Sequence, residues 1–210
     1  MAPRASTRDL LLDAAARLYA ERGIDNVSVA EIVRAAGQRN ASAVRYHFGS
    51  REEVLRALLA RHVPEIAERR RELLGVARAR PAGDVRSAAD AIVRPVTELA
   101  ARGWRERAYL QIGSDLAGGR QPLDPGIREV MDRTEGREAW ALLRKRCPEM
   151  PADLWRARRK ICIVFVGRAA AERAWHLDQG AGRRVLPEER FVDNMIEMLL
   201  GAMKAPHSDG

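Results

Sequence analysis

The stretch GQRNASAVRYHFGSREE, residues 37–53, holds the side chains best suited to binding chemistry. Four arginines lie between positions 34 and 51, and no acidic residue follows Glu31 until Glu52. Guanidinium groups bind phosphates and can donate two hydrogen bonds to guanine, while nearby amide and hydroxyl groups bind phosphate oxygens or base edges. This combination predicts a surface for an anionic partner.

The overall charge is consistent with an anionic partner but does not identify that partner. The chain has a formal net charge of +8 and a calculated isoelectric point of about 10.4. Such a balance favours an anionic partner, but it does not separate nucleic acid from a membrane surface or an acidic protein. Outside residues 34–51, arginines alternate with acidic residues, as on solvated helical faces.

Several function classes lack their sequence signatures. Cys147 and Cys162 have no metal-ligand spacing, which predicts two reduced thiols in a cytoplasmic protein, with no metal site and no cofactor. No apolar stretch approaches the roughly 20 residues that span a bilayer, so no membrane contact is expected. The HExxH, GxSxG, P-loop and GxGxxG motifs are absent and the four histidines are dispersed, which argues against an enzyme.

Apolar residues recur with helical spacing along nearly the whole chain, which predicts an all-α fold. The sequence SVAE at Ser28 is a capping box that opens a helix ending at Gly37. Asn40 can cap a short helix over residues 41–46, and the second capping box, SREE at Ser50, opens a longer helix continuing towards Leu74.

Beyond a linker at residues 78–84, the sequence predicts a larger helical region. Pro95 should kink one of its helices, and the last residues, 206–210, are predicted to be disordered. The expected helices cover residues 85–102, 104–116, 125–146, 152–177 and 188–205.

The last two of these helices are unusually apolar. A helix that is apolar almost all round must be buried on more than one side, and symmetric dimers are the commonest oligomers. A second copy of the chain could therefore cover part of this surface, although a core within one chain would explain the same pattern. The candidate dimer residues are Ile161, Val164, Phe165, Val192, Met195, Ile196, Leu199, Leu200 and Met203.

A capped helix, a sharp turn and a short helix carrying Arg, Ser and Tyr predict a helix-turn-helix, whose second helix enters the DNA major groove. Within it, Arg45 is suited to guanine, whereas Tyr46, His47 and Arg51 are suited to phosphates. The candidate DNA contacts are Ser28, Arg39, Asn40, Ser42, Ala43, Arg45, Tyr46, His47 and Arg51.

The motifs TRDLLLDAAARLYAERGIDNVSVAEIVRAAG and AVRYHFGSREEVLRALL resemble the N-terminal domain of the TetR family of transcriptional regulators, over about residues 7–60. The turn before Phe48 is one residue longer than the commonest family spacing. The resemblance implies a DNA-binding domain at residues 1–50 and a helical effector-binding and dimerisation domain at residues 51–205.

The resemblance also implies an effector pocket in the second domain. Tryptophans and a few polar groups there would suit an apolar or aromatic small molecule. Packing in an ordinary core remains the alternative for each candidate. The candidate pocket residues are Trp104, Tyr109, Gln111, Met131, Trp140, Trp155, Phe165 and His176.

The resemblance thus implies a TetR-like homodimer that binds a near-palindromic double-stranded DNA operator, acts as a repressor and is released by a small-molecule effector. The alternative is an architectural DNA-binding protein that tolerates many sequences and has no effector. Steep salt dependence with little sequence preference would distinguish that alternative.

Overall fold

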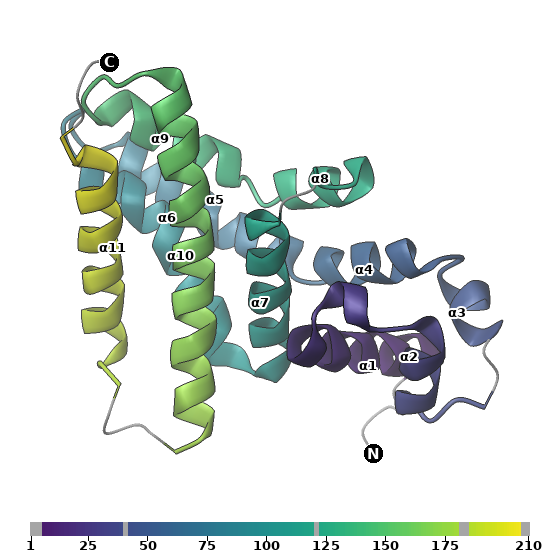
Figure 1. The fold of residues 1–210 in the computed structure, drawn as a ribbon. Helices are drawn as coiled ribbons and strands as arrows, with labels where there is room; N and C mark the ends of the chain where they lie inside the picture. The colour runs from purple at the N-terminus through teal and green to yellow at the C-terminus, as the bar shows by residue number, and fades with distance from the viewer. Residues whose placement is uncertain (1–5, 40–41, 120–121, 181–184, 207–210) are drawn as a thin grey trace.

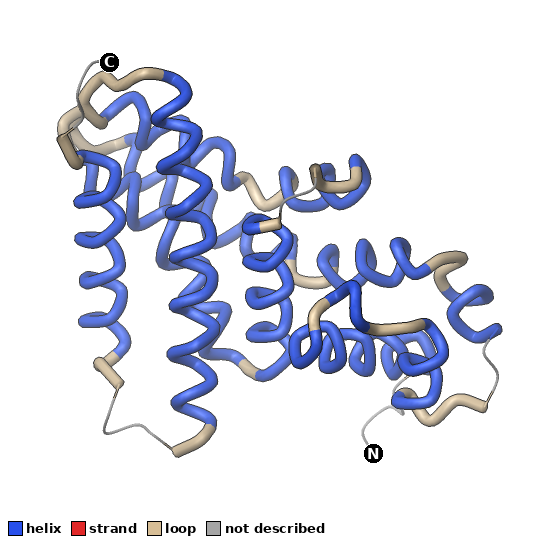
Figure 2. Tube along the Cα trace, in the orientation of Figure 1, coloured by secondary structure: helices blue, strands red, loops and turns tan. Residues whose placement is uncertain are grey.

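The computed structural model describes residues 6–39, 42–119, 122–180 and 185–206, and within these ranges every regular element is a helix (Figure 1, Figure 2). The first elements are α1 (Thr7–Arg22), the short 3₁₀ helix η1 (Ile24–Asn26), α2 (Val29–Ala35), α3 (Ser42–His47) and α4 (Arg51–Ala60). The larger helical body contains α5 (Val63–Arg78), α6 (Val85–Arg102), α7 (Trp104–Gly118), α8 (Pro125–Asp132), α9 (Gly136–Arg146), α10 (Ala152–Asp178) and α11 (Glu188–Lys204).

The ends of the first helices follow their capping residues. Ser28 and Glu31 form the predicted capping box: the Glu31 N–H donates to the Ser28 hydroxyl at 3.3 Å, and the Ser28 N–H donates to the Glu31 carboxylate at 2.9 Å. Gly37 follows α2 with φ 68°, a left-handed conformation that favours glycine. Helix α3 begins at Ser42, and the predicted cap Asn40 lies outside the described residues.

The start of α4 uses only half of the predicted second capping box. The Ser50 hydroxyl accepts a hydrogen bond from the Glu53 N–H at 3.2 Å. The Glu53 carboxylate, however, binds Arg56 one turn further on. Helix α4 therefore begins where the sequence predicted, with an ion pair in place of the second capping bond.

Two helices that the sequence predicted to be continuous are each divided. The helix that was expected to continue from Ser50 towards Leu74 ends at Ala60, and α5 begins at Val63 with Pro64 in its first turn. Proline has no N–H to donate to the preceding turn, so it is accepted at a helix start and disfavoured within one. The predicted helix over residues 125–146 breaks at Glu135, whose φ of 58° is left-handed.

Pro95, in contrast, lies inside α6 without ending it. Because proline donates no hydrogen bond, the carbonyl of Ala91, four residues earlier, lacks its helical partner. The buried Arg70 of α5 supplies one: its Nε donates to the Ala91 carbonyl at 3.1 Å, and another of its nitrogens donates to the Thr134 carbonyl beyond α8. Burial lowers the pKa of Arg70 to about 10, so it stays charged at neutral pH while joining these elements.

The core forms two clusters of buried side chains. The first lies among α1–α4, α7 and α8, with further residues from α5, α6 and α10, and contains the fully buried Tyr19, Leu59 and Ile112. The second lies among α5, α6, α9, α10 and α11. Helix α4 contributes all its buried apolar residues to the first cluster, and α7 joins the clusters by packing on both α1 and α10.

The apolar stripe of α11 is covered by other helices of the same chain, whereas the sequence predicted it as part of a dimer interface. All six candidate dimer residues on this helix lie in the second cluster and are between 0 and 7% exposed, so the stripe packs within the chain: Val192, Met195, Ile196, Leu199, Leu200 and Met203. Val164 and Phe165 are half-buried. Among the dimer candidates, Ile161 is the most exposed, at 67%, and is open to a second copy.

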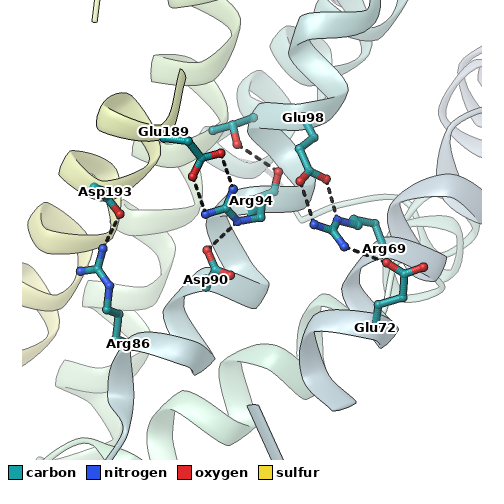
Figure 3. Close-up of polar contacts among 9 residues, drawn as sticks. Arg69, Glu72, Arg86, Asp90, Arg94, Glu98, Glu189 and Asp193 are labelled. Carbon is teal, nitrogen blue, oxygen red and sulfur yellow. Dashed lines mark hydrogen bonds and ion pairs between the residues drawn. The ribbon is translucent and has the colours of Figure 1, made fainter. Parts of the chain in front are cut away.

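Ion pairs hold α6 to its neighbours on both sides (Figure 3). Arg94 of α6 binds Glu189 of α11 at 2.9 Å and Asp90 at 3.0 Å. Arg69 of α5 binds Glu98 of α6 at 2.7 Å. Polar side chains at the edges of α6 therefore fix the register of helices whose apolar faces meet in the second cluster.

The two methionines of α11 offer a matched test of this packing. Met195 is 2% exposed, whereas Met198 on the same helix is 50% exposed. Met195→Ala should lower the free energy of unfolding by about 2–5 kcal/mol, because it opens a cavity in the second cluster. Met198→Ala should change it by about 0.5 kcal/mol or less. Urea unfolding at one protein concentration measures both, and equal effects would contradict the observed orientation of α11.

Candidate nucleic-acid interface

Helix α3 presents one face to the protein and another to solvent. Val44 is 2% exposed and anchors the helix in the first cluster, and Phe48 just beyond it packs on the same cluster. Arg45 is exposed, and Tyr46 is 86% exposed. These neighbouring residues therefore project from the outer face of a short helix that follows a capped helix and a turn, as in a helix-turn-helix.

The other candidates on α3 and its turn differ in exposure. Arg39 and Ser42 are exposed, whereas Ala43 is half-buried and packs against the first cluster. His47 is half-buried, and its ring meets that of Tyr46 edge-on with 5.0 Å between centroids. The imidazole thus supports the position of the exposed phenol.

Ser28 acts as a helix cap in this structure. Its hydroxyl donates to the Glu31 carboxylate at 2.7 Å, in addition to the two capping bonds. These bonds from Ser28, together with one from Arg22, lower the pKa of Glu31 to about 2. The Ser28 side chain remains exposed at the start of α2.

Arg51 differs from the prediction that it holds a phosphate. Its guanidinium donates a hydrogen bond to the carbonyl of Ile24 and lies 5.8 Å from the centroid of the Tyr19 ring. Arg51 is half-buried and ties the start of α4 to the turn after α1. We therefore remove Arg51 from the proposed phosphate contacts.

This difference between Arg51 and Arg45 can be tested by protein stability. Arg51→Ala should lower the free energy of unfolding by about 1–3 kcal/mol, because the Ile24 carbonyl loses its donor. Arg45→Ala, at an exposed position, should change it by about 0.5 kcal/mol or less. Thermal or urea unfolding measures both. An Arg51→Ala protein as stable as the Arg45→Ala protein would return Arg51 to the candidate DNA contacts.

A carboxylate joins the first four α-helices to the larger body. Asp13 of α1 binds Arg61, at the break between α4 and α5, at 2.8 Å, and Arg105 of α7 at 2.6 Å. Burial on its own would raise the pKa of Asp13, but the hydrogen bonds from Arg105 and Arg61 outweigh it and hold this pKa below its usual value. The group is therefore ionised at neutral pH and links three elements.

Two of the predicted pocket residues strengthen the same junction. The guanidinium carbon of Arg17 lies 3.7 Å from the centroid of the Trp104 ring, a cation–π contact between α1 and α7. The Gln111 side chain donates to the Ala20 carbonyl at 2.6 Å. Trp104 and Gln111 thus position α7 against α1.

The remaining pocket candidates do not line one cavity. Tyr109 is buried in the first cluster and Met131 packs against it, whereas Trp140 and Trp155 meet edge-on in the second cluster, 6.5 Å apart. Helical periodicity shows which residues face inward, but it does not show which of two clusters they enter. The last two candidates, Phe165 and His176, line a groove on α10.

This groove, of about 610 Å³, lies between α10 and the segment that leads into α11. Its floor is apolar, and Arg173 closes one side: the guanidinium lies 4.9 Å from the centroid of the Phe191 ring and donates to the Leu186 carbonyl at 3.1 Å. The sequence prediction missed Arg173, Leu186 and Phe191, because no local motif brings them together. Six of its ten lining residues are apolar: Val164, Phe165, Ala169, Val185, Leu186 and Phe191.

A buried histidine lies where the DNA-binding helices join the larger body. His62 precedes α5, is 7% exposed and packs on Tyr109 with 5.2 Å between ring centroids. Its Nδ1 lies 3.8 Å from a carboxylate oxygen of Glu106. Burial lowers the pKa of His62, opposed by Glu106 and assisted by the positive charges of Arg61, Arg102 and Arg105. The folded protein therefore favours the neutral imidazole.

This burial predicts a pH dependence of stability. In the unfolded chain the imidazole titrates near 6.5, and in the folded protein it titrates lower. Between these two pKa values the unfolded state binds more protons, so stability is lost as the pH falls below about 6.5. Urea unfolding between pH 7.5 and 5.5 should show this loss, and His62→Gln should reduce it. A variant with the same pH profile as the wild type would contradict the assignment.

Two searches of the described residues gave negative results. No described helix has the length and apolar character needed to cross a membrane. No group of three or more His, Cys, Asp or Glu side chains in this part of the chain is arranged to hold a metal ion.

Comparison with known proteins identifies the first domain. Residues 11–58 match the model of a family described as bacterial regulatory proteins, tetR family. The match spans the elements that position Arg45 and Tyr46, from α1 to most of α4. The N-terminal domain belongs to the TetR family. No curated protein sequence matches the chain.

Solved structures share the fold of this chain over nearly its whole length. A TetR-family transcriptional regulator from Bordetella parapertussis has a TM-score of 0.62 at 20% identity, covering 94% of this chain and 95% of its own. The ketosteroid regulator KstR2 of Mycobacterium tuberculosis gives 0.61 at 19%, covering 97% of each chain. The fatty acid degradation regulator FadR from Bacillus halodurans gives 0.56 at 18%, covering 94% of this chain and 96% of its own. At sequence identities of 18–20%, the similarity shows a shared fold alone.

Proposed function

We propose that this protein is a transcription regulator that reads a DNA operator by placing α3 in the major groove. The outer face of α3 carries the proposal: Arg45 and the 86% exposed Tyr46 project outward, whereas Val44 holds the helix on the domain. Arg45 is suited to a forked pair of hydrogen bonds to guanine, and the Tyr46 hydroxyl to a phosphate. Arg39 and Ser42 supply further exposed groups.

The regulator is proposed to act in the cytoplasm as a homodimer on a near-palindromic operator, as a repressor that occludes a promoter. Exposed apolar side chains on the outer face of α10 support a contact with a second copy: Ile161 is 67% exposed and Trp175 56%. Two symmetry-related α3 helices would then reach successive major grooves, so that the half-sites repeat at the helical spacing of the duplex.

A small-molecule effector is proposed to release the protein from DNA. The groove on α10 is the best-supported site, because its floor is apolar and a few charged groups surround it. An apolar or aromatic molecule fits this lining. Such a molecule changes DNA affinity only through its different affinities for two states of the protein, typically by about 1–3 kcal/mol. Helix α7, which packs on both α10 and α1, joins the two regions.

Selection from random duplex DNA by the full-length protein at about physiological salt tests this function. An enriched near-palindrome with half-sites about one helical turn or more apart is expected. Binding without enrichment, lost as salt rises, would instead support the architectural alternative.

Two substitutions on α3 separate base reading from phosphate binding. Arg45→Ala should weaken binding to the selected operator by about 1–3 kcal/mol and relax the preference at one position in each half-site. Tyr46→Phe, which removes one hydroxyl, should weaken binding to all sequences alike. Titrations against the operator and its single-base variants measure both effects. Unchanged preference in Arg45→Ala would exclude Arg45 as the reading residue.

A further inference from the structure

The densest basic segment of the chain lies outside the DNA-binding domain, where the alternation of arginines with acidic residues expected outside residues 34–51 breaks down. Residues 144–160 contain seven basic side chains and two acidic ones, Glu149 and Asp153. This excess of five positive charges is larger than that of residues 34–51, which hold four arginines. The basic residues are Arg144, Lys145, Arg146, Arg156, Arg158, Arg159 and Lys160.

The fold gathers these residues at one end of the molecule. Arg158 donates to the Ala205 carbonyl at 2.8 Å, which joins the start of α10 to the end of α11. Arg144 of α9 lies 5.7 Å from the Trp155 ring centroid, which joins the end of α9 to α10. Figure 1 shows the end of α9, the start of α10 and the end of α11 together, far from α2 and α3.

Two of the seven are internal hydrogen-bond donors. Arg146 donates to the carbonyls of Ala77 at 2.6 Å and Asp84 at 2.7 Å, closing the turn between α5 and α6. Arg158 closes the end of α11. The exposed basic residues at this end, which we call the distal basic surface, are Arg144, Lys145, Arg156, Lys160 and Lys204.

The side chains of the distal basic surface have no carboxylate partners, unlike several arginines on the sides of the helical body. Figure 3 shows three of these paired arginines, Arg69, Arg86 and Arg94. Within the described residues, none of the five side chains of the distal basic surface forms an ion pair; Lys160 donates weakly to the Gly119 carbonyl, at 3.4 Å. Unpaired like charges held close together repel one another and are stabilised by an anion.

We propose that the distal basic surface binds the phosphate backbone of duplex DNA. A row of phosphates needs no apolar contact and no particular base sequence. A protein partner would need an apolar anchor, and a membrane surface would need apolar side chains that insert. No large apolar residue between positions 144 and 160 is exposed, and one exposed apolar side chain, Ile161 at 67%, directly follows Lys160. Five unpaired charges beside one exposed apolar side chain therefore favour a nucleic-acid backbone.

The separation of the distal basic surface from α3 determines how DNA can lie on the protein. Helix α3 and the distal basic surface lie at opposite ends of the described chain (Figure 1), so one duplex segment cannot lie straight across both. With α3 on one duplex segment and the distal basic surface on another, the protein holds two DNA segments at once. This inference rests on the proposed function for the α3 contact alone. The distal contact is independent of sequence, whereas α3 selects the site.

The test neutralises the distal basic surface in the full-length protein. The variant carries Arg144→Gln, Lys145→Gln, Arg156→Gln and Lys160→Gln, all at exposed helical positions. The matched control carries Arg71→Gln, Arg78→Gln, Arg86→Gln and Arg137→Gln, which remove the same charge from exposed arginines that are paired with acids. Both are titrated with random-sequence duplex DNA over a series of salt concentrations.

Loss of four phosphate contacts should reduce the slope of log K against log salt by about 3 to 4 for each chain, since each contact contributes about 0.9. The control should keep the slope of the wild type. In a second assay, a biotinylated duplex should retain a fluorescent duplex through the wild type and the control, but not through the distal variant. Distal and control variants that behave alike in both assays would overturn the proposal.

A double variant on α3, Arg45→Ala with Tyr46→Ala, separates this inference from the proposed function. If it alone abolishes duplex binding and the distal variant binds as the wild type does, operator reading stands and the distal contact fails. If the distal variant alone loses duplex binding, the distal contact stands and the role of α3 fails. Binding of the wild type to vesicles of anionic lipid that the distal variant loses, with duplex binding unchanged, would overturn the proposal in favour of a membrane surface.

Discussion

The carboxylate of Asp13 fixes how the DNA-binding helices sit on the rest of the protein. It accepts hydrogen bonds from Arg61, at the break between α4 and α5, and from Arg105 of α7, and it is partly shielded from water. A partly buried carboxylate that loses one partner keeps the cost of desolvation without the compensating bond. The orientation of α1 therefore depends on α4 and α7 together. A shift of α7 must either carry α1 with it or break this charge pair.

Two prolines give the junction its shape. Pro64 separates α4 from α5, and the break places His62 against α7 and Arg61 against Asp13 of α1. Pro95 leaves a carbonyl in α6 without a helical donor, and Arg70 of α5 fills the gap while also binding the carbonyl of Thr134. A residue that cannot donate a hydrogen bond thus leaves the acceptor through which Arg70 joins α5 to α6 and to the turn after α8. Pro95, where the sequence predicted a kink, is therefore also an attachment point for α5.

Local signals in the sequence predicted the local structure well. The capping box at Ser28, the glycine at position 37 and the helical spacing of apolar residues predicted the helix-turn-helix, because each acts within a few residues. The same approach did not detect the breaks at Arg61 and Glu135, since apolar spacing continues across a change of helix direction.

Contacts between distant residues could not be predicted from the sequence. Arg51 was interpreted as a DNA contact because of its charge, but it binds a carbonyl 27 residues earlier. The stripe of α11 has the width of an interface and is used inside one chain. The pocket candidates share chemistry but belong to two separate clusters. In each case the chemical character of the side chain was predicted, but its partner was not, because the partner depends on how distant helices pack together.

The turn between α5 and α6, with its proline and glycine at positions 81 and 83, looks like a natural place to lengthen the chain. Arg146, however, makes this turn unsuitable for an insertion. From α9, this one side chain holds the carbonyls on both sides of the turn, at Ala77 and Asp84, and the Ser87 hydroxyl as well. An inserted peptide would pull these acceptors apart and leave a guanidinium without partners. For a fused fluorescent protein or a circular permutation, this exposed hairpin is a poor choice despite its composition, because its geometry is set from outside the loop.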